Sequence, residues 1–159
     1  RGYDRRVSAL RIRTAEPEDV PVLLGLIREL AEYERLGHEV VATEDGLRAG
    51  LFGAQASAEA LIAQVDGEVA GFALYFPTFS TFLARPGIWL EDLFVRPALR
   101  GKGYGRALLA HLAGLAAERG CGRLEWAVLD WNEPAQGFYR QFGAAPLADW
   151  STWRLPIKP

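Results

Sequence analysis

A glycine-rich turn is the part of the sequence whose residue types point most directly to chemistry. It reads Arg100-Gly101-Lys102-Gly103-Tyr104-Gly105. It follows a strand predicted over residues 88–95 and opens a helix predicted to run to about Arg119. The first N–H groups of a helix lack partners inside it, and the helix dipole favours negative charge there. The turn therefore predicts a phosphate or pyrophosphate site, with Arg100, Lys102 and Arg106 adding charge at its rim.

Two better-known glycine motifs do not fit this turn. A phosphate-binding loop would read G-x-x-x-x-G-K-[ST], which the chain lacks. The dinucleotide fingerprint G-x-G-x-x-G is not matched either, because this sequence lacks its third glycine. That fingerprint also needs an acidic residue at the end of a following strand, whereas Glu118 is expected inside the helix. The alternative is a plain tight turn with no ligand, because glycine turns are common.

Two adjacent carboxylates, Glu91 and Asp92, interrupt the apolar strand 88–95. A carboxylate inside so apolar a strand is costly unless it is paired or functional. Neighbouring strand residues point to opposite faces, so we expect the two groups to serve two environments. The structural alternative is a buried ion pair, for example with Arg96 or Arg123.

Glu34 lies where the first helix is expected to end. Pro17 suits the first turn of this helix and Gly37 is expected to stop it. Its apolar residues fall on one stripe. They are Val20, Leu23, Leu24, Ile27, Leu30 and Ala31. Glu34 continues that stripe beside Tyr33, so it is either an inward-facing acidic wall or a helix end that has already reached solvent.

The remaining elements complete a single mixed α/β domain over residues 9–159, preceded by a loose arm at residues 1–8. Strands are predicted over 9–13, 59–65, 68–76, 88–95, 123–129 and 153–157, with a hairpin at Asp66-Gly67 and a loop over 77–87. Helices are predicted after Pro17, over 44–51, after the glycine turn, and from Asn132 to Gly143. This order predicts a mixed, mostly antiparallel sheet flanked by helices on both faces.

Composition excludes several classes of protein. The chain has 159 residues and a net charge of -2, which argues against a nucleic-acid binder. Its one cysteine, Cys121, allows no intrachain disulfide and favours a reducing compartment, so we expect a cytoplasmic protein. His38 and His111 stand far apart without cysteine partners, so no metal site is expected. No apolar run approaches the ~20 residues that span a membrane.

Several motifs together resemble one known family. Leu93-Phe94-Val95-Arg96-Pro97 with the glycine turn looks like the acetyl-CoA motif of the GNAT superfamily of N-acetyltransferases. Further segments resemble its diamine (spermidine/spermine) branch and the thialysine-acetylating relatives. They are Ile27 to Glu34, Trp89-Leu90-Glu91-Asp92, Trp131-Asn132-Glu133-Pro134 and Phe138-Tyr139. The resemblance covers roughly Leu10 to Ile157. It implies the GNAT fold, in which the fourth and fifth strands splay apart around the pantetheine arm.

The resemblance also implies roles for individual residues. Tyr139 is expected to be the acid that protonates the departing thiolate, and Glu91 to accept the ammonium proton directly or through water. Tyr33, Glu34 and Asp92 are expected to bind the amine. Acetyl-CoA is expected to meet the glycine turn, with Arg106 and Asn132 also contacting it and with backbone donors from Phe94, Val95 and Arg96. Asn132 has a purely structural alternative, because it can cap its helix. A homodimer is implied as well.

One departure from the branch bears on the substrate. Polyamine acetyltransferases tend to carry acidic residues just before the final Trp-Arg, whereas Asp149 is the only acid before Trp153-Arg154. A shorter amine such as thialysine, lysine or a diamine is therefore favoured over a long polyamine. Phe79, Phe82 and Trp150 are either aromatic walls for such an amine or dimer contacts. Two alternatives remain: acetylation of a peptide or protein, which the aromatic loop 77–87 disfavours, and a non-catalytic acyl-CoA-binding module.

Overall fold

The computed structural model describes residues 9–159, so the arm predicted at residues 1–8 lies outside the described residues. The chain forms two compact units, the first ending at Ala127 and the second running from Val128 to Pro159. The first unit contains a five-stranded sheet and three α-helices, and the second contains one helix, α4 (Glu133–Gln141).

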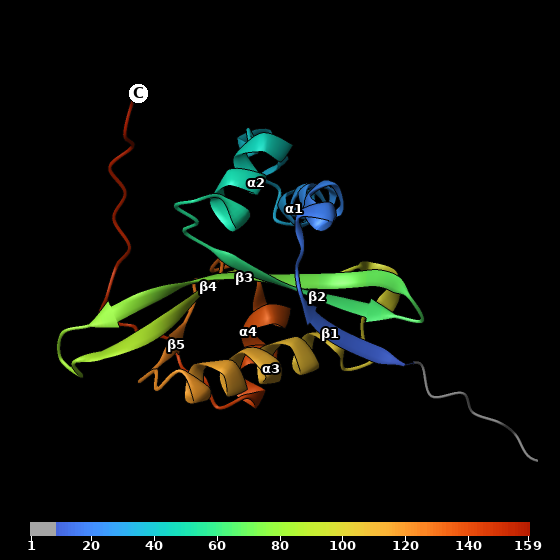
Figure 1. Cartoon of the computed structure of the whole chain (residues 1–159). Helices are drawn as coiled ribbons and strands as arrows, with labels where there is room; N and C mark the ends of the chain where they lie inside the picture. Colours follow the sequence, from blue (N-terminus) through green and yellow to red (C-terminus); the bar gives the residue numbers. More distant parts are fainter. Residues whose placement is uncertain (1–8) are drawn as a thin grey trace, which may run out of the picture. The chain divides into compact units, whose positions relative to one another are not determined.

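The sheet has the strand order β1-β2-β3-β4-β5 (Figure 1). Its strands are β1 (Leu10–Thr14), β2 (Glu59–Val65), β3 (Glu68–Ser80), β4 (Arg85–Val95) and β5 (Leu124–Glu125). The first four strands pair antiparallel in sequence order, and β5 pairs parallel to β4. The hairpin between β2 and β3 turns at Asp66-Gly67, as the sequence predicts. The mixed, mostly antiparallel sheet is thus confirmed.

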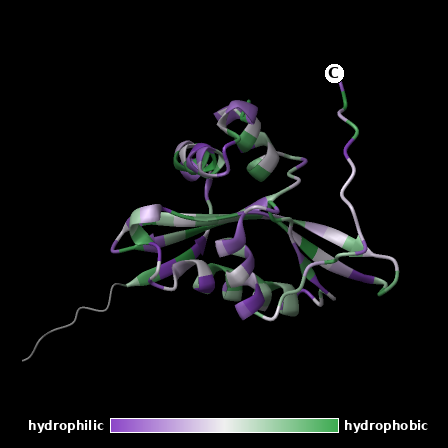
Figure 2. Ribbon diagram, turned by 180° about the vertical axis from the view of Figure 1, so that it is seen from behind, coloured by the Kyte–Doolittle hydropathy of each residue, from purple (hydrophilic) through white to green (hydrophobic). Residues whose placement is uncertain are grey.

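Helices cover both faces of the sheet. α1 (Val20–Tyr33) and α2 (Glu44–Phe52) lie on one side and α3 (Tyr104–Glu118) on the other, as Figure 1 shows. Strands and helices both carry hydrophobic and hydrophilic residues (Figure 2). This distribution is what a sheet covered by amphipathic helices requires.

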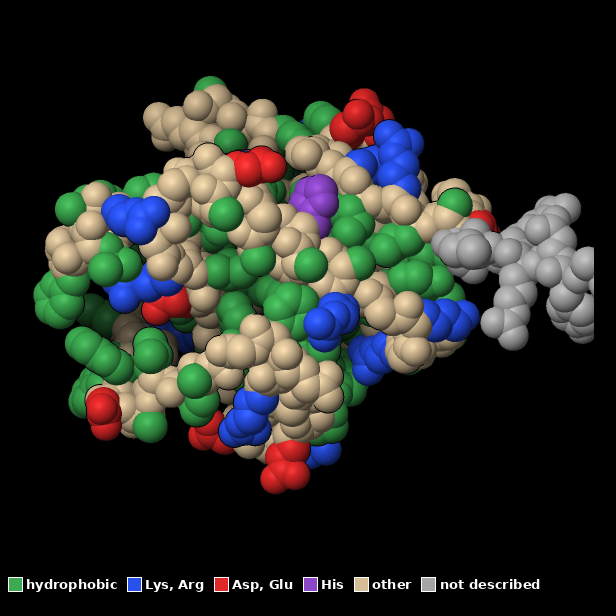
Figure 3. All heavy atoms as spheres, turned by 90° about the horizontal axis from the view of Figure 1, so that it is seen from below, with side chains coloured by type: hydrophobic (Ala, Val, Ile, Leu, Met, Phe, Trp, Pro, Cys, Tyr) green, Lys and Arg blue, Asp and Glu red, His purple; other side chains and the backbone are tan. Residues whose placement is uncertain are grey.

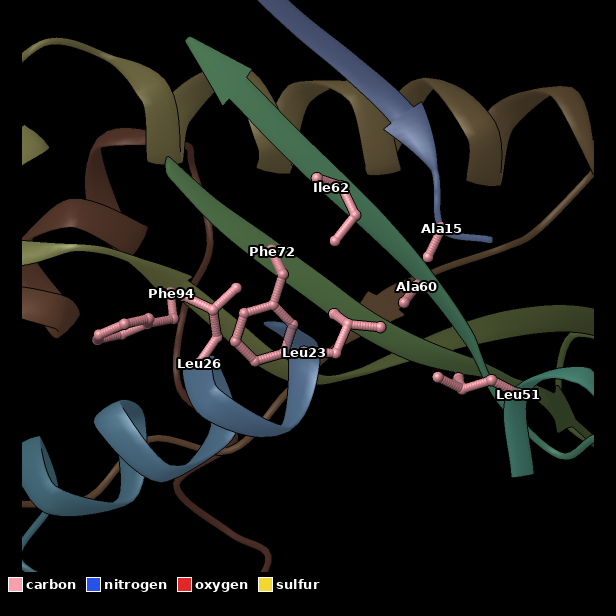
Figure 4. Close-up of a cluster of buried hydrophobic side chains, with 8 residues drawn as sticks. All are labelled: Ala15, Leu23, Leu26, Leu51, Ala60, Ile62, Phe72 and Phe94. Atoms are coloured by element: carbon pink, nitrogen blue, oxygen red, sulfur yellow. The ribbon is translucent and has the colours of Figure 1, made fainter. Parts of the chain in front are cut away.

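The core between α1 and the sheet places the end of α1 above β4. Phe72 of β3 and Phe94 of β4 pack with Leu23 and Leu26 of α1, and all four side chains are at most 4% exposed (Figure 4). Leu26 was not on the predicted stripe, yet it is fully buried. At ~25 cal/mol for each Å² of apolar surface, such burial is the main force holding α1 against the sheet.

The C-terminal end of α1 differs from the sequence prediction. The helix ends at Tyr33 with Glu34 as its cap, and Arg35 takes a left-handed conformation with a φ of 62°. The N–H of Leu36 donates to the carbonyl of Ala31 at 2.8 Å, which closes the helix in a Schellman motif. Gly37 was expected to stop the helix, but it begins a separate 3-10 turn instead. Hydrogen bonding of the last carbonyls thus outweighs the cost of a non-glycine residue at positive φ.

Three further predictions about elements are wrong. The segment 77–87 is no aromatic loop, because β3 continues to Ser80 and β4 begins at Arg85. The resulting hairpin projects beyond α3 in Figures 1 and 2, with Phe82 94% exposed at its turn. The strand predicted over 123–129 shrinks to the two residues of β5, and the strand predicted over 153–157 does not form. The closed pocket inferred from an aromatic loop therefore loses its basis.

Candidate active site

The glycine turn joins the end of β4 to the start of α3. Gly101 and Gly103 have φ angles of 77° and 84°, which side-chain-bearing residues rarely adopt. No atom lies within 4 Å of the point where a Cβ would stand on either glycine, leaving the adjoining space open. α3 begins at Tyr104, directly after Gly103, so the predicted order of strand, glycine turn and helix is confirmed.

The first N–H groups of α3 are arranged as an anion site requires. The N–H of Ala107 donates to the carbonyl of Gly103 at 3.0 Å, which is the first bond of the helical ladder. The N–H groups of Tyr104 and Gly105 precede that bond, and Gly103 has no side chain with which to cap them. These donors and the positive end of the helix dipole fit a phosphate or diphosphate.

A β-bulge in β4 changes how the strand presents its two carboxylates. Asp92 pairs in register with Leu74 and Leu90 pairs with Tyr75, so Glu91 is the extra residue in β4. A bulge bends the strand and re-aims its side chains, and bulges are frequent beside active sites. Glu91 is exposed and Asp92 is half-buried, in keeping with the two environments that the sequence predicts. The bulge itself has no signal in the sequence.

The outer edge of β4 is open beyond its short pairing with β5. The last pair in register is Trp89 with Glu125, although β4 continues to Val95. The N–H of Arg96 donates to the carbonyl of Ala70 at 2.9 Å. Because successive N–H groups along a strand point to opposite edges, the N–H of Phe94 also faces β3, whereas that of Val95 faces the open edge. The expectation that all three residues supply backbone donors to a ligand is therefore corrected: Val95 alone among them faces outward.

Three carboxylates of the first unit influence one another. Burial raises the pKa of Asp92 to about 7, with further contributions from Glu91 and then Glu34. Burial also raises the pKa of Glu34, and the carboxylate of Glu91 raises it further. Glu34 is half-buried at the C-terminal cap of α1. The helix end and the bulged strand thus form a shared acidic group: Glu34, Glu91 and Asp92.

Glu91 and Asp92 do not form the buried ion pairs with Arg96 or Arg123 that the sequence suggests as a structural alternative. Arg96 lies 3.5 Å from a carboxylate oxygen of Glu29, and Arg123 lies 3.2 Å from one of Glu125. Glu91 instead accepts a hydrogen bond at 3.0 Å from the indole Nε1–H of Trp89. Sequence reasoning missed this donor, although the spacing of two residues along a strand brings side chains to one face.

The side chain of Arg100 contacts residues outside the glycine turn. Its Nε donates to the carbonyl oxygen of Val95 at 2.9 Å. Its guanidinium carbon lies 4.7 Å from the ring centroid of Tyr33 and 5.3 Å from that of Phe94. Tyr33, predicted to bind the amine, and Arg100, predicted to bind the cofactor, are therefore in contact. Lys102 stands in the turn with its side chain exposed.

The second unit holds the two other residues that the sequence singled out. Asn132 caps α4, because its side-chain oxygen accepts a hydrogen bond from the N–H of Ala135 at 3.3 Å. The capping interpretation is thus confirmed. Tyr139 lies within α4, where its ring centroid is 5.3 Å from that of Phe138. Phe138 in turn lies 5.8 Å from Phe142, so the helix carries a short aromatic row.

Other kinds of site find little support. In residues 9–159, no group of three or more His, Cys, Asp or Glu side chains is arranged to hold a metal ion. Over the same residues, no helix combines the length and apolar character needed to cross a bilayer. Cys121 is half-buried after the end of α3, away from the glycine turn in sequence. On the face seen in Figure 3, the Lys and Arg side chains are scattered among apolar and acidic ones.

Comparison with known proteins agrees with this arrangement. The family model "Acetyltransferase (GNAT) family" matches residues 25–144. The thialysine N-epsilon-acetyltransferase of Bos taurus is 40% identical over 89% of this chain and 88% of its own. The L-ornithine N5-acetyltransferase of Arabidopsis thaliana is 35% identical over 91% of this chain and 83% of its own. An integron cassette protein from the V. cholerae mobile metagenome superposes with a TM-score of 0.78 at 29% identity, covering 93% of each chain. The fold, the glycine turn and these relatives together establish that the chain belongs to the acetyltransferase (GNAT) family and is an N-acetyltransferase.

Proposed function

We propose that this enzyme transfers an acetyl group from acetyl-CoA to a primary amine of a small molecule. The observation that carries the proposal is the group of three carboxylates, Glu34, Glu91 and Asp92, on the first unit. Such a group attracts an ammonium ion, and Asp92, whose pKa is raised to about 7, can exchange a proton near neutral pH. The family fixes the class of reaction, and these carboxylates favour a cationic acceptor.

The residues of the glycine turn fit the diphosphate of acetyl-CoA. The N–H groups of Gly103, Tyr104, Gly105 and Arg106 would hold it at the start of α3, and the left-handed glycines leave the backbone accessible. When bound, acetyl-CoA supplies a thioester whose acetyl group a neutral amine can accept. The outward N–H of Val95, at the open edge of β4, would donate to a carbonyl oxygen there.

The carboxylates would bind the amine and take up its proton. A free alkyl ammonium has a pKa of about 10.4, so an acceptor is needed before the nitrogen can attack. Glu91 is the proposed acceptor, directly or through water, with the indole of Trp89 fixing one of its oxygens. Glu34 and Asp92 would bind the cation, and Tyr33 would line the same side. A second positive charge, which the substrate keeps after its amine loses a proton, would reduce the electrostatic repulsion among the carboxylates.

Tyr139 is proposed as the acid of the reaction. A phenol keeps its proton at pH 7 and can donate it to a thiolate. The proposal rests on the match of Phe138-Tyr139 to the family motif, together with the aromatic packing that holds the ring. Direct transfer from acetyl-CoA to the amine is proposed, because Cys121 has no place in the candidate site as a nucleophile.

The acceptor is proposed to be a short amino acid or diamine. Thialysine and ornithine, which appear in the names of two relatives, are short molecules with a terminal amine. The residues before Trp153 carry one acid, Asp149, which gives little to hold the second charge of a long polyamine. We further propose a homodimer, supported by apolar side chains exposed near the C-terminus. They are Trp150, Trp153, Leu155 and Ile157. A cytoplasmic location is proposed from the lone cysteine.

A thiol-release assay with acetyl-CoA tests the proposed function. The panel would contain thialysine, ornithine, lysine, putrescine and spermidine, with a lysine peptide as the control for protein acetylation. Turnover is expected to be highest on the short amines, with mass spectrometry confirming the acetylated product. A preference for the peptide would contradict the proposal and indicate that the enzyme acetylates proteins. Silence on every acceptor despite binding of CoA would favour an acyl-CoA-binding module.

A further inference from the structure

Arg100 offers a further role in the proposed reaction. The sequence suggests a phosphate ligand, because the residue opens the glycine turn. The structure uses its guanidinium elsewhere: Nε donates to the carbonyl of Val95, and the guanidinium carbon lies 4.7 Å from the ring centroid of Tyr33 and 5.3 Å from that of Phe94. A cation within about 6 Å of a ring centroid is attracted by the ring, and a guanidinium does this best because it is flat.

Tyr33 is placed where this contact matters for the substrate. It is the last residue of α1, and the next residue, Glu34, caps the helix and interacts with the carboxylate of Glu91. The helix ends after these two residues at Arg35, which takes the positive φ that a glycine usually adopts at this position. Arg100 therefore joins the end of α1 to the end of β4 through one side chain.

We propose that Arg100 is a positioning residue for amine binding: it fixes Tyr33, and through it Glu34, against the end of β4. This inference rests on the proposed function for its substrate, although the contact itself does not. Arg100 then acts on the Michaelis constant for the amine, and its effect on CoA is small. A phosphate ligand at this position would behave in the opposite way.

Two substitutions separate these roles. Arg100→Lys keeps the positive charge but loses the planar stack and the Nε bond, whereas Arg100→Leu loses all three. Both variants are expected to raise KM for the preferred amine by about fivefold or more, as loss of a cation–π contact allows. Arg100→Lys should leave the Kd for CoA, measured by calorimetry, within about twofold of the wild type. Arg48→Leu, which removes an exposed arginine on α2, is the matched control and should change neither constant.

A double-mutant cycle with Tyr33→Leu gives the decisive result. If Arg100 acts through Tyr33, the double variant is expected to raise the amine KM no further than Tyr33→Leu does alone. The same cycle on urea unfolding reports the contact without any activity. Additive effects in both cycles, or a tenfold loss of CoA affinity in Arg100→Lys at unchanged amine KM, would overturn the inference. A wild-type enzyme inactive on every amine would instead overturn the proposed function, while the unfolding cycle would still test the contact.

Discussion

The indole Nε1–H of Trp89 donates a 3.0 Å hydrogen bond to Oε2 of Glu91, two residues further along β4. The bulge leaves Glu91 without a register partner in β3, so the strand ladder alone does not fix its carboxylate. The indole therefore restricts a side chain that the backbone leaves less constrained. Such support is what preorganisation requires of Glu91 if it is the proton acceptor proposed above.

Replacing Trp89 by Phe should slow the reaction without changing CoA binding. The ring remains but the donor is lost, so kcat for the preferred amine is expected to fall by about threefold to tenfold. Steady-state kinetics and calorimetry with CoA measure the two quantities. In a Glu91→Gln background the same replacement should cause little further loss. An equal further loss there would show that Trp89 acts independently of Glu91.

Asp92 should destabilise the folded chain when it is ionised. Burial raises its pKa from 3.8 to about 7, so the folded state holds this proton more tightly than the unfolded chain does. The resulting stability is complete below about pH 4 and is lost as the pH rises through about 7. Asp92→Asn should therefore increase the free energy of unfolding at pH 8, by up to about 4 kcal/mol, with little change at pH 4.

Urea unfolding at the two pH values measures this difference. Asp45→Asn is the control, because that carboxylate is exposed on α2. A gain at pH 8 equal to the gain at pH 4 would mean that the effect of Asp92→Asn is not due to ionisation. With acetyl-CoA and a short amine present, the same variant should raise the amine KM, because it removes one of the carboxylates proposed to bind the cation.

Gly103→Ala should weaken CoA binding and destabilise the fold. A residue with a Cβ at a φ of 84° costs about 1–2 kcal/mol, and relief of that strain would turn the N–H groups of α3 away from the ligand. Gly114→Ala is a matched control in the same helix, where no atom crowds the new Cβ and alanine favours the helix. Calorimetry and thermal unfolding should show loss in the first variant and a small gain of stability in the second. Normal CoA affinity in Gly103→Ala would count against the turn as the diphosphate site.

Tyr139→Phe tests the proposed acid. The phenyl ring keeps the packing against Phe138, so the fold should be unaffected and only the hydroxyl is lost. Turnover is expected to fall by about tenfold or more at near-normal CoA affinity, because only the step that needs a proton is impaired. Unchanged turnover would remove Tyr139 from the mechanism.

The ends of the helices show which parts of the fold local sequence determines. α3 and α4 are followed by Gly120 and Gly143, both at positive φ, as the sequence predicts. α1 was expected to end at Gly37, but hydrogen bonds to its last carbonyls place Arg35 in the same conformation. Glycine is the usual residue there but not an obligatory one, so a scan for glycine misplaces this boundary.

The candidate site divides in the same way. The glycine turn before α3 follows from spacing along one element, and it is present. The bulge at Glu91 and the stacking of Arg100 on Tyr33 depend on contacts between elements, which periodicity does not report. The strand expected over 153–157 has the alternating apolar residues of a strand, but such alternation gives no partner for its hydrogen bonds.

Amide NMR of the isotopically labelled enzyme titrated with CoA tests whether the diphosphate binds at the glycine turn. The largest shifts are expected on the N–H groups of Gly103, Tyr104, Gly105 and Arg106, where the diphosphate would meet the start of α3. Saturable CoA binding that leaves these four resonances in place and shifts others would contradict that placement of the diphosphate.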